Sequence, residues 1–212
     1  MNNITNVYFD TEFTELSKNG KLISIGLVAM DRSFDILKAF YAEVNEEYYK
    51  DNINDFVRNN VIPNLFLKTA TLSTEISYSL RTETTFVHGT IEQIRNALVE
   101  WLDEFDSQIT LVSDVAHYDM TLFIDIFGTA KDLPSYICPA VYDINQDIAR
   151  YSNCSLKLAF DMNREKLLSN MTNVDITSSL YRYYKSMGNR KHNSLYDAVV
   201  IYLLYIYLNA EV

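Results

Sequence analysis

The chain contains little glycine and proline and has no long apolar run. Its 212 residues include only five glycines and three prolines, which argues against a disordered or low-complexity protein. No apolar run reaches the roughly 18 residues that would span a membrane. The N-terminus lacks the basic start and apolar stretch of a signal peptide. We therefore expect a cytoplasmic protein without a membrane segment.

Cysteine is also scarce, with Cys138 and Cys154 as the two examples. Two cysteines do not make a disulfide framework, and their spacing fits no zinc motif. We expect both thiols to be reduced and structural.

Positive charge is in the minority, because 18 lysines and arginines face 28 acidic residues and the net charge is −10. This balance is unfavourable for a protein that grips long stretches of nucleic acid through phosphates. A small site for one strand end remains compatible with it. Basic residues gather near the C-terminus, where residues 176–196 hold no acidic side chain but include Arg182, Lys185, Arg190 and Lys191. Tyrosines alternate with these cations, which suits single-stranded nucleic acid, although a helix with a solvated face has the same pattern.

The opening of the chain reads as three strands, over Asn6–Phe13, Leu22–Met30 and Phe40–Val44. Turn signals separate them, so we predict an antiparallel three-stranded meander. Helical patterns follow, with one more strand over 109–112. The predicted helices cover 55–62, the segment capped by Thr90 with Gln93, 118–127, 143–151, 155–162 and the segment from Ser194 onward. Residues 64–88 read as a loop or extension that lies over the domain. This order predicts one α/β domain over residues 1–212, with a mixed central sheet flanked by helices.

The first candidate site residues lie on the first strand. Side chains alternate along a strand, so Asp10 and Glu12 point to the same face, while Phe9 and Phe13 point to the other. Two neighbouring carboxylates in an apolar strand repel each other, and a bound Mg²⁺ or Mn²⁺ ion would resolve that conflict. The alternative is a solvent-exposed face of the strand.

Two further carboxylates follow the strand over 109–112. Asp119 falls where that strand gives way to a helix, a common place for ligand-binding residues in α/β sheets. Asp119 could also be an ordinary cap of its helix, and Asp114 is the competing candidate.

The last candidates surround the start of the final helix. If Ser194 caps this helix, Asp197 follows three residues later as in a capping box, and His192 lies on the preceding loop. The alternative is an ordinary cap beside a surface histidine.

Taken together, these residues fit one mechanism. Four carboxylates (Asp10, Glu12, Asp119 and Asp197) can hold two divalent cations that flank a scissile phosphate. Histidine has an ordinary pKa near 6.5, so His192 can take a proton from the attacking water.

In order and spacing, these segments resemble the three motifs of the DEDDh superfamily of 3′→5′ exonucleases. Those segments are Asp-Thr-Glu-Phe from Asp10, Tyr118-Asp119, and His192 with Asp197 five residues on. The closer resemblance is to the RNase AS-like exoribonucleases of bacteria and phages. It extends with gaps from Val7 to about Tyr205 and includes residues 40–44, 56–63 and 122–128.

The resemblance implies a ribonuclease-H-like fold, two Mg²⁺ or Mn²⁺ ions and the 3′ ends of single-stranded RNA as substrate. It also implies a homodimer and a preference for RNA that contains adenylate. Two positions depart from the superfamily: Asp114 stands where many members have asparagine, and Ser194 where alanine is usual.

Several residues near the motifs are candidates for binding the substrate. From its position after the metal strand, Phe13 could stack on the terminal base and Glu15 could contact the terminal ribose. The other candidates are Asp114, Tyr118, Arg190 and Lys191. Two alternatives stay open beside the RNA exonuclease: a 3′→5′ exodeoxyribonuclease for single-stranded DNA, and a non-catalytic RNA-binding protein with the same fold.

Overall fold

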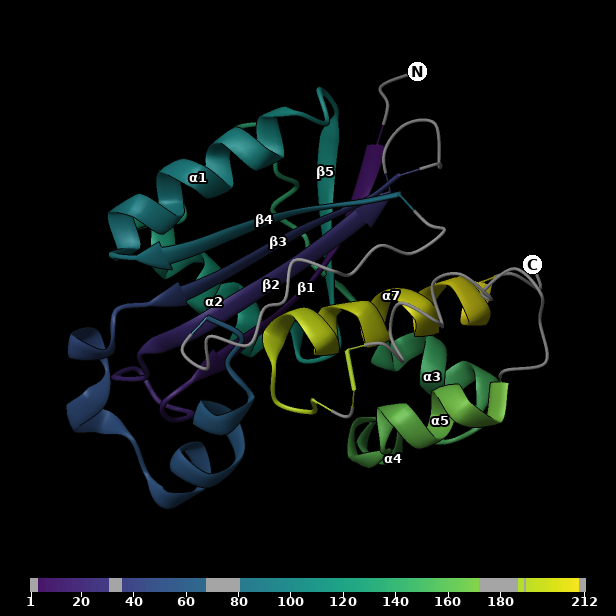
Figure 1. Cartoon of the computed structure of the whole chain (residues 1–212). Helices are drawn as coiled ribbons and strands as arrows, with labels where there is room; N and C mark the ends of the chain where they lie inside the picture. Colours follow the sequence, from purple (N-terminus) through teal and green to yellow (C-terminus); the bar gives the residue numbers. More distant parts are fainter. Residues whose placement is uncertain (1–3, 31–35, 68–80, 172–186, 189, 210–212) are drawn as a thin grey trace.

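A six-stranded mixed sheet forms the centre of the computed structural model, which describes residues 4–30, 36–67, 81–171, 187–188 and 190–209 (Figure 1). The strand order is β4-β3-β2-β1-β5-β6. The strands are β1 (Ile4–Phe13), β2 (Leu22–Met30), β3 (Ile36–Val44), β4 (Arg81–Gly89), β5 (Gln108–Ser113) and β6 (Tyr142–Asp143).

The predicted meander is confirmed. Strand β2 pairs antiparallel with β1 and with β3, and its continuous apolar sequence is buried on both faces. Strand β3 begins at Ile36, four residues earlier than the sequence suggested. The other pairs, β3–β4, β1–β5 and β5–β6, are parallel.

The prediction of a loop over residues 64–88 is wrong for its last part. Residues 81–89 form β4, which lies at the edge of the sheet and pairs along its whole length with β3. All side chains from Glu83 to His88 are exposed or half-buried. The strand therefore lacks the apolar alternation by which a strand is recognised from sequence. Residues 68–80 lie outside the part of the chain that the structure describes.

Helices cover both faces of the sheet (Figure 1). One face packs against α1 (Ile91–Asp103) and α2 (Ala116–Phe127), and the predicted capping box of Thr90 and Gln93 begins α1. The other face packs against α7 (Ser194–Asn209) with α3 (Asn145–Tyr151), α4 (Leu156–Asp161) and α5 (Arg164–Met171). Helix α5 was not predicted. The 55–62 segment forms a π-helical turn over Val57–Val61 and a 3-10 turn over Ile62–Asn64.

None of the described helices has both the length and the apolar character needed to cross a membrane. Cys138 and Cys154 are both free thiols.

Helix α7 begins directly on the sheet because β2 carries a glycine there. A Cβ atom added to Gly26 would lie 2.3 Å from the backbone nitrogen of Leu195 and 2.4 Å from its Cα. Beside this contact the hydroxyls of Ser24 and Ser194, both fully buried, are 3.0 Å apart. The first turn of α7 is thus fixed over β2, next to the carboxylates of β1.

Replacing Gly26 with alanine should destabilise the protein by about 2–3 kcal/mol, because an extra methyl must displace rigid helix backbone. Urea unfolding measures this change. The control is Gly89→Ala, where the added methyl would meet the flexible end of the Gln93 side chain. We expect a clearly smaller loss there, and equal losses would contradict the account of the Gly26 contact.

Candidate active site

The two carboxylates of β1 lie on the face that α7 covers. Asp10 is paired across the sheet with Gly26, and Glu12 with Ser24. Both of these β2 residues contact the first turn of α7. Phe9 packs in the core on the opposite face. The alternation of side chains along β1 places both carboxylates on one face, as the sequence predicted, and this face meets the start of α7.

Asp119 reaches the same place from the first turn of α2. Its Oδ1 accepts hydrogen bonds from the backbone nitrogen and the hydroxyl of Thr11, at 3.1 and 2.6 Å, and its Oδ2 accepts from the hydroxyl of Ser113. These contacts fix the orientation of a carboxyl that is only 2% exposed. Burial raises the pKa of Asp119 to about 7, and the hydrogen bonds from Ser113 and Thr11 oppose that rise.

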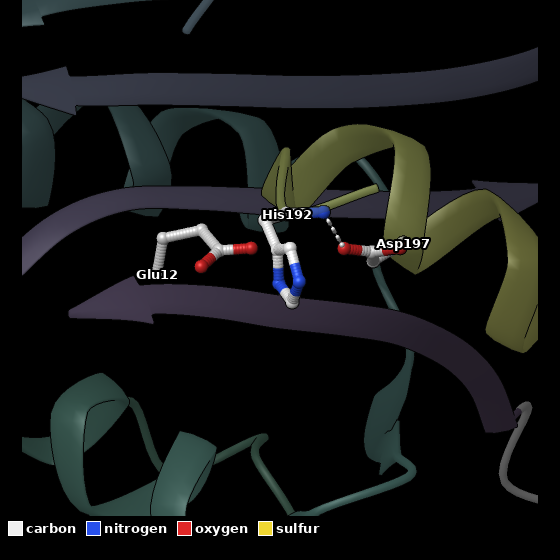
Figure 2. Close-up of side chains that lie close together, drawn as sticks. All are labelled: Glu12, His192 and Asp197. Carbon is white, nitrogen blue, oxygen red and sulfur yellow. Dashed lines mark hydrogen bonds between the residues drawn. The ribbon is translucent and has the colours of Figure 1, made fainter. Parts of the chain in front are cut away.

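His192 and Asp197 enter the site from the loop before α7 and from its first turn. The backbone nitrogen of His192 donates to Oδ2 of Asp197 at 2.9 Å (Figure 2). The predicted capping box is wrong, because Asn193 and not Ser194 caps α7. Oδ1 of Asn193 accepts from the backbone nitrogens of Leu195 and Tyr196, both at 3.2 Å.

The acidic side chains and His192 form two groups of potential metal ligands. One group is Glu12, His192 and Asp197, whose side chains point toward one another in Figure 2. The other is Asp10, Asp114 and Asp119. Within each group the ligand atoms lie within 4.8 Å of one another. The four carboxylates singled out from the sequence are thus divided between two adjacent groups.

Electrostatics in the site favour protonated carboxyls as long as no cation is bound. Burial, followed by the neighbouring carboxylates, raises the pKa of Asp10 and of Glu12 well above the ordinary value. Burial and then Asp114 raise the pKa of Asp197 in the same way. For His192, burial and then Lys191 lower the pKa, so the imidazole is neutral at pH 7. Such a cluster of buried like charges suits hard divalent cations, which prefer oxygen ligands.

Asp114 has a partner that the sequence did not reveal. Nε of Arg164 lies 2.9 Å from Oδ2 of Asp114, and both side chains are largely buried. The same guanidinium donates to the carbonyls of Ala159 and Met162 and to Oδ1 of Asn145. Arg164 therefore compensates the extra carboxylate and joins α3, α4 and α5 to the carboxyl end of β5.

We expect Arg164→Met to destabilise the protein by about 2–4 kcal/mol, because it leaves Asp114 as an uncompensated carboxylate in a largely buried place. Urea unfolding of Arg164→Met, Asp114→Asn and the double variant tests this. The double variant should recover part of the loss, since it removes both charges. Strictly additive losses would show that the pair makes no net interaction.

A cleft of about 590 Å³ opens over these groups. The substrate candidates Phe13, Glu15, Asp114, Tyr118 and Lys191 line it. Arg190 does not: its guanidinium packs over the ring of Phe66, 5.0 Å from the centroid, and its Nε donates to the carbonyl of Met187. The basic, tyrosine-rich segment that precedes Met187 lies outside the described residues.

The cleft also has an apolar rim that sequence reasoning missed. Leu16, Phe56 and Phe160 are 63%, 55% and 45% exposed, and all three line it. The ring of Phe56 meets that of His192 edge-on, with 5.2 Å between the centroids. The sequence signal for Phe160 was the spacing of Leu156, Leu158 and Phe160, because residues two apart do not share one face of a helix. All three side chains are exposed in the structure.

Comparisons with known proteins identify the fold through solved structures. No family model matches the sequence, and no curated protein matches it. A crystal structure described as a full-length 3′-exonuclease is similar over 98% of this chain and 82% of that one, with a TM-score of 0.60 and 13% identity.

Two further solved structures give the same result. One is the nuclease domain of 3′hExo, described as a DEDDh family member bound to rAMP. It has a TM-score of 0.57 at 13% identity, over 98% of this chain and 92% of that one. The other shows a 3′-exonuclease in 3′-end specific recognition of a histone mRNA stem-loop, with a TM-score of 0.58 at 14% identity, over 98% and 82%. The chain therefore has the mixed, ribonuclease-H-like fold of these nucleases, as the sequence predicted.

Proposed function

We propose that the chain is a metal-dependent 3′→5′ exonuclease of the DEDDh type that removes nucleotides from RNA 3′ ends. The observation that carries this proposal is the convergence of Asp10, Glu12, Asp119, Asp197 and His192 at one cleft. These residues come from three separate parts of the chain and match the order of the DEDDh motifs. The likeness in fold to 3′-exonucleases supports the same activity.

The four carboxylates would hold two Mg²⁺ or Mn²⁺ ions. When bound, the cations neutralise charge on the scissile phosphate and lower the pKa of the attacking water. Hydrogen bonds orient the carboxylate oxygens of Asp119, which fits the role of a metal ligand. The raised pKa values of the other three carboxyls fit it too, because cations would relieve the repulsion between the carboxylates.

His192 would be the general base. Its neutral imidazole can accept a proton at pH 7. It lies beside Glu12 and Asp197 (Figure 2) and lines the cleft. The backbone hydrogen bond from His192 to Asp197 ties the base to a carboxylate of the metal cluster. A proton acceptor held in this way contributes typically about 10²–10⁴-fold to the rate.

The substrate would be a single strand whose last nucleotides enter the cleft. Phe13 and Tyr118 offer rings for base stacking, Glu15 can accept hydrogen bonds from ribose hydroxyls, and Lys191 can meet a phosphate. RNA is favoured because one similar structure contains rAMP and another recognises an mRNA stem-loop. A preference for adenylate and a homodimeric state belong to the proposal through the family resemblance.

The test is a time course with 5′-labelled single-stranded RNA and its DNA counterpart, with Mn²⁺ or with EDTA. We expect a ladder that shortens from the 3′ end, needs the metal and is faster on RNA. A 3′-phosphate on the RNA should block the start of the reaction. Equal rates on RNA and DNA would favour the exodeoxyribonuclease alternative, and intact RNA in every lane would favour a binding protein.

A further inference from the structure

Two rows of residues in register across the sheet connect the carboxylates of β1 with polar groups on β3. Across the sheet, Asp10 is in register with Gly26 and then Tyr41, and Glu12 is in register with Ser24 and then Glu43. Side chains in register across neighbouring strands point to the same face. Tyr41 and Glu43 therefore lie on the α7 side of the sheet, across Gly26 and Ser24 from the proposed metal ligands.

Asn193 is the residue that contacts this second group. Its side chain is fully buried, and both of its polar atoms make hydrogen bonds. Oδ1 caps α7, as described above, while Nδ2 donates to the hydroxyl of Tyr41 at 3.2 Å and to the carbonyl of Asn64 at 2.8 Å. One side chain thus joins the start of α7 to β3 and to the turn that ends at Asn64.

The partners of Asn193 are fixed in turn. The hydroxyl of Tyr41 donates to Oε1 of Glu43 at 2.7 Å, and the same oxygen accepts from the backbone nitrogen of Leu67 at 2.8 Å. Nδ2 of Asn64 donates to the carbonyl of Lys191 at 2.9 Å. The network therefore holds the loop on both sides of His192.

His192 needs such support because its backbone is in the left-handed region, with φ at 67°. For a residue with a side chain this conformation costs on the order of 1–2 kcal/mol, and it persists where the surroundings determine it. The carbonyl before His192 is held by Asn64, its own nitrogen by Asp197, and the residue after it by Tyr41 and the turn.

We propose that Asn193 is a positioning residue that, through Tyr41 and Asn64, fixes the backbone of His192 so that the imidazole faces Glu12 and Asp197. This role rests on the proposed function of His192 as the general base. A helix cap alone needs only an acceptor, which serine or aspartate supplies equally well. The two N–H groups of the Asn193 side-chain amide donate to Tyr41 and to Asn64, which lie outside the helix. These two hydrogen bonds carry the positioning role.

The test compares Asn193→Ser, which keeps an acceptor for the cap but loses both donors, with Tyr41→Phe, which removes only the hydroxyl that Asn193 contacts. Ser194→Ala is the matched control, because it removes one buried hydrogen bond, to Ser24, in the adjacent residue. For Asn193→Ser on a short RNA with Mn²⁺ we expect kcat to fall about 10–100-fold with KM within about threefold, since misplacing a reacting group by about 1 Å costs up to about 10²-fold. Tyr41→Phe should change kcat in the same direction but less.

Two results would overturn the proposal. One is a kcat for Asn193→Ser within twofold of that of the unaltered protein. The other is an equal loss of kcat in Ser194→Ala at a similar drop in melting temperature, which would make the effect one of general stability.

A second readout does not depend on catalysis. The chain has three histidines, so the ring signals of His192 can be assigned by NMR with His192→Ala. We expect one sharp set in the unaltered protein and in Ser194→Ala, and several or broadened sets in Asn193→Ser. Identical spectra in all three would overturn the positioning role even if the chain proved inactive, whereas an inactive chain with the expected spectra would overturn only the proposed function.

Discussion

Replacing Asp10 with asparagine will abolish catalysis and at the same time stabilise the metal-free protein. Catalysis should fall by about 10³-fold or more, since several kcal/mol of transition-state stabilisation by the cations would be lost. The stabilisation follows from burial and from Asp119, Asp197 and Glu12, which together raise the pKa of Asp10. Asparagine keeps the shape of the side chain and removes one of the repelling charges.

The measurement is the melting temperature in EDTA, together with the rate on RNA in Mn²⁺. We expect Asp10→Asn to melt a few degrees higher than the unaltered protein, because about 1 kcal/mol corresponds to about 2–4 °C in a chain of this size. Asp51→Asn is the control, since Asp51 is exposed and is not among the residues that line the cleft. A lower melting temperature for Asp10→Asn in EDTA would show that the carboxylates are not in conflict.

The second large effect is a dependence of stability on pH that metal reverses. Carboxyls with raised pKa values hold more protons in the folded state than in the unfolded state, so the metal-free protein gains stability as pH falls. For Asp119 the window lies between its ordinary value of 3.8 and about 7. Each proton taken up contributes about 1.4 kcal/mol per pH unit within such a window.

His192 acts in the opposite direction. Because burial lowers its pKa, its contribution to stability is present above the ordinary value near 6.5 and is lost as pH falls below it. One histidine opposes four carboxyls, so the carboxyls determine how the stability of the metal-free protein changes with pH.

Melting curves between about pH 8 and pH 6 test the direction of the pH dependence with and without metal. In EDTA the melting temperature should rise as the pH falls. In Mn²⁺ it should fall over the same range, because protons compete with the cations for the carboxylates. The same slope with and without Mn²⁺ would contradict a metal site built from these residues.

The carboxylates of the proposed metal site could be found from the sequence because their placement follows from local rules. Asp10 and Glu12 share a face by the period of a strand, and Asp119 follows the end of one. His192 and Asp197 were found from their spacing around a helix start. In each case a local pattern gives the place of the residue in the fold, while the contacts that orient Asp119 and His192 come from distant residues.

The remaining parts of the site depend on partners that are distant in the chain. Arg164 lies 50 positions from Asp114 and 19 from Asn145, and no local pattern signals either contact. Arg190 was chosen for its charge and its place beside Lys191, yet its guanidinium packs on Phe66 outside the cleft. Charge alone did not distinguish a ligand-binding cation from one that covers an aromatic ring.

The cap of α7 shows how tertiary contacts decide between equivalent local signals. Both Asn193 and Ser194 are good capping residues. Ser194 is instead drawn to Ser24 by the close approach at Gly26, and Asn193 takes the cap while it reaches Tyr41. Strand β4 escaped prediction for a related reason, since it is stabilised by pairing with β3 and not by an apolar face of its own.

The most direct test of the proposed two-metal site is a calorimetric titration of the metal-free protein with Mn²⁺, in parallel with Asp10→Asn. We expect about two ions per chain in the unaltered protein and a loss of at least one of them in the variant. Binding that is absent, or that is the same in both proteins, would contradict the assignment of Asp10, Glu12, Asp119 and Asp197 as the metal ligands.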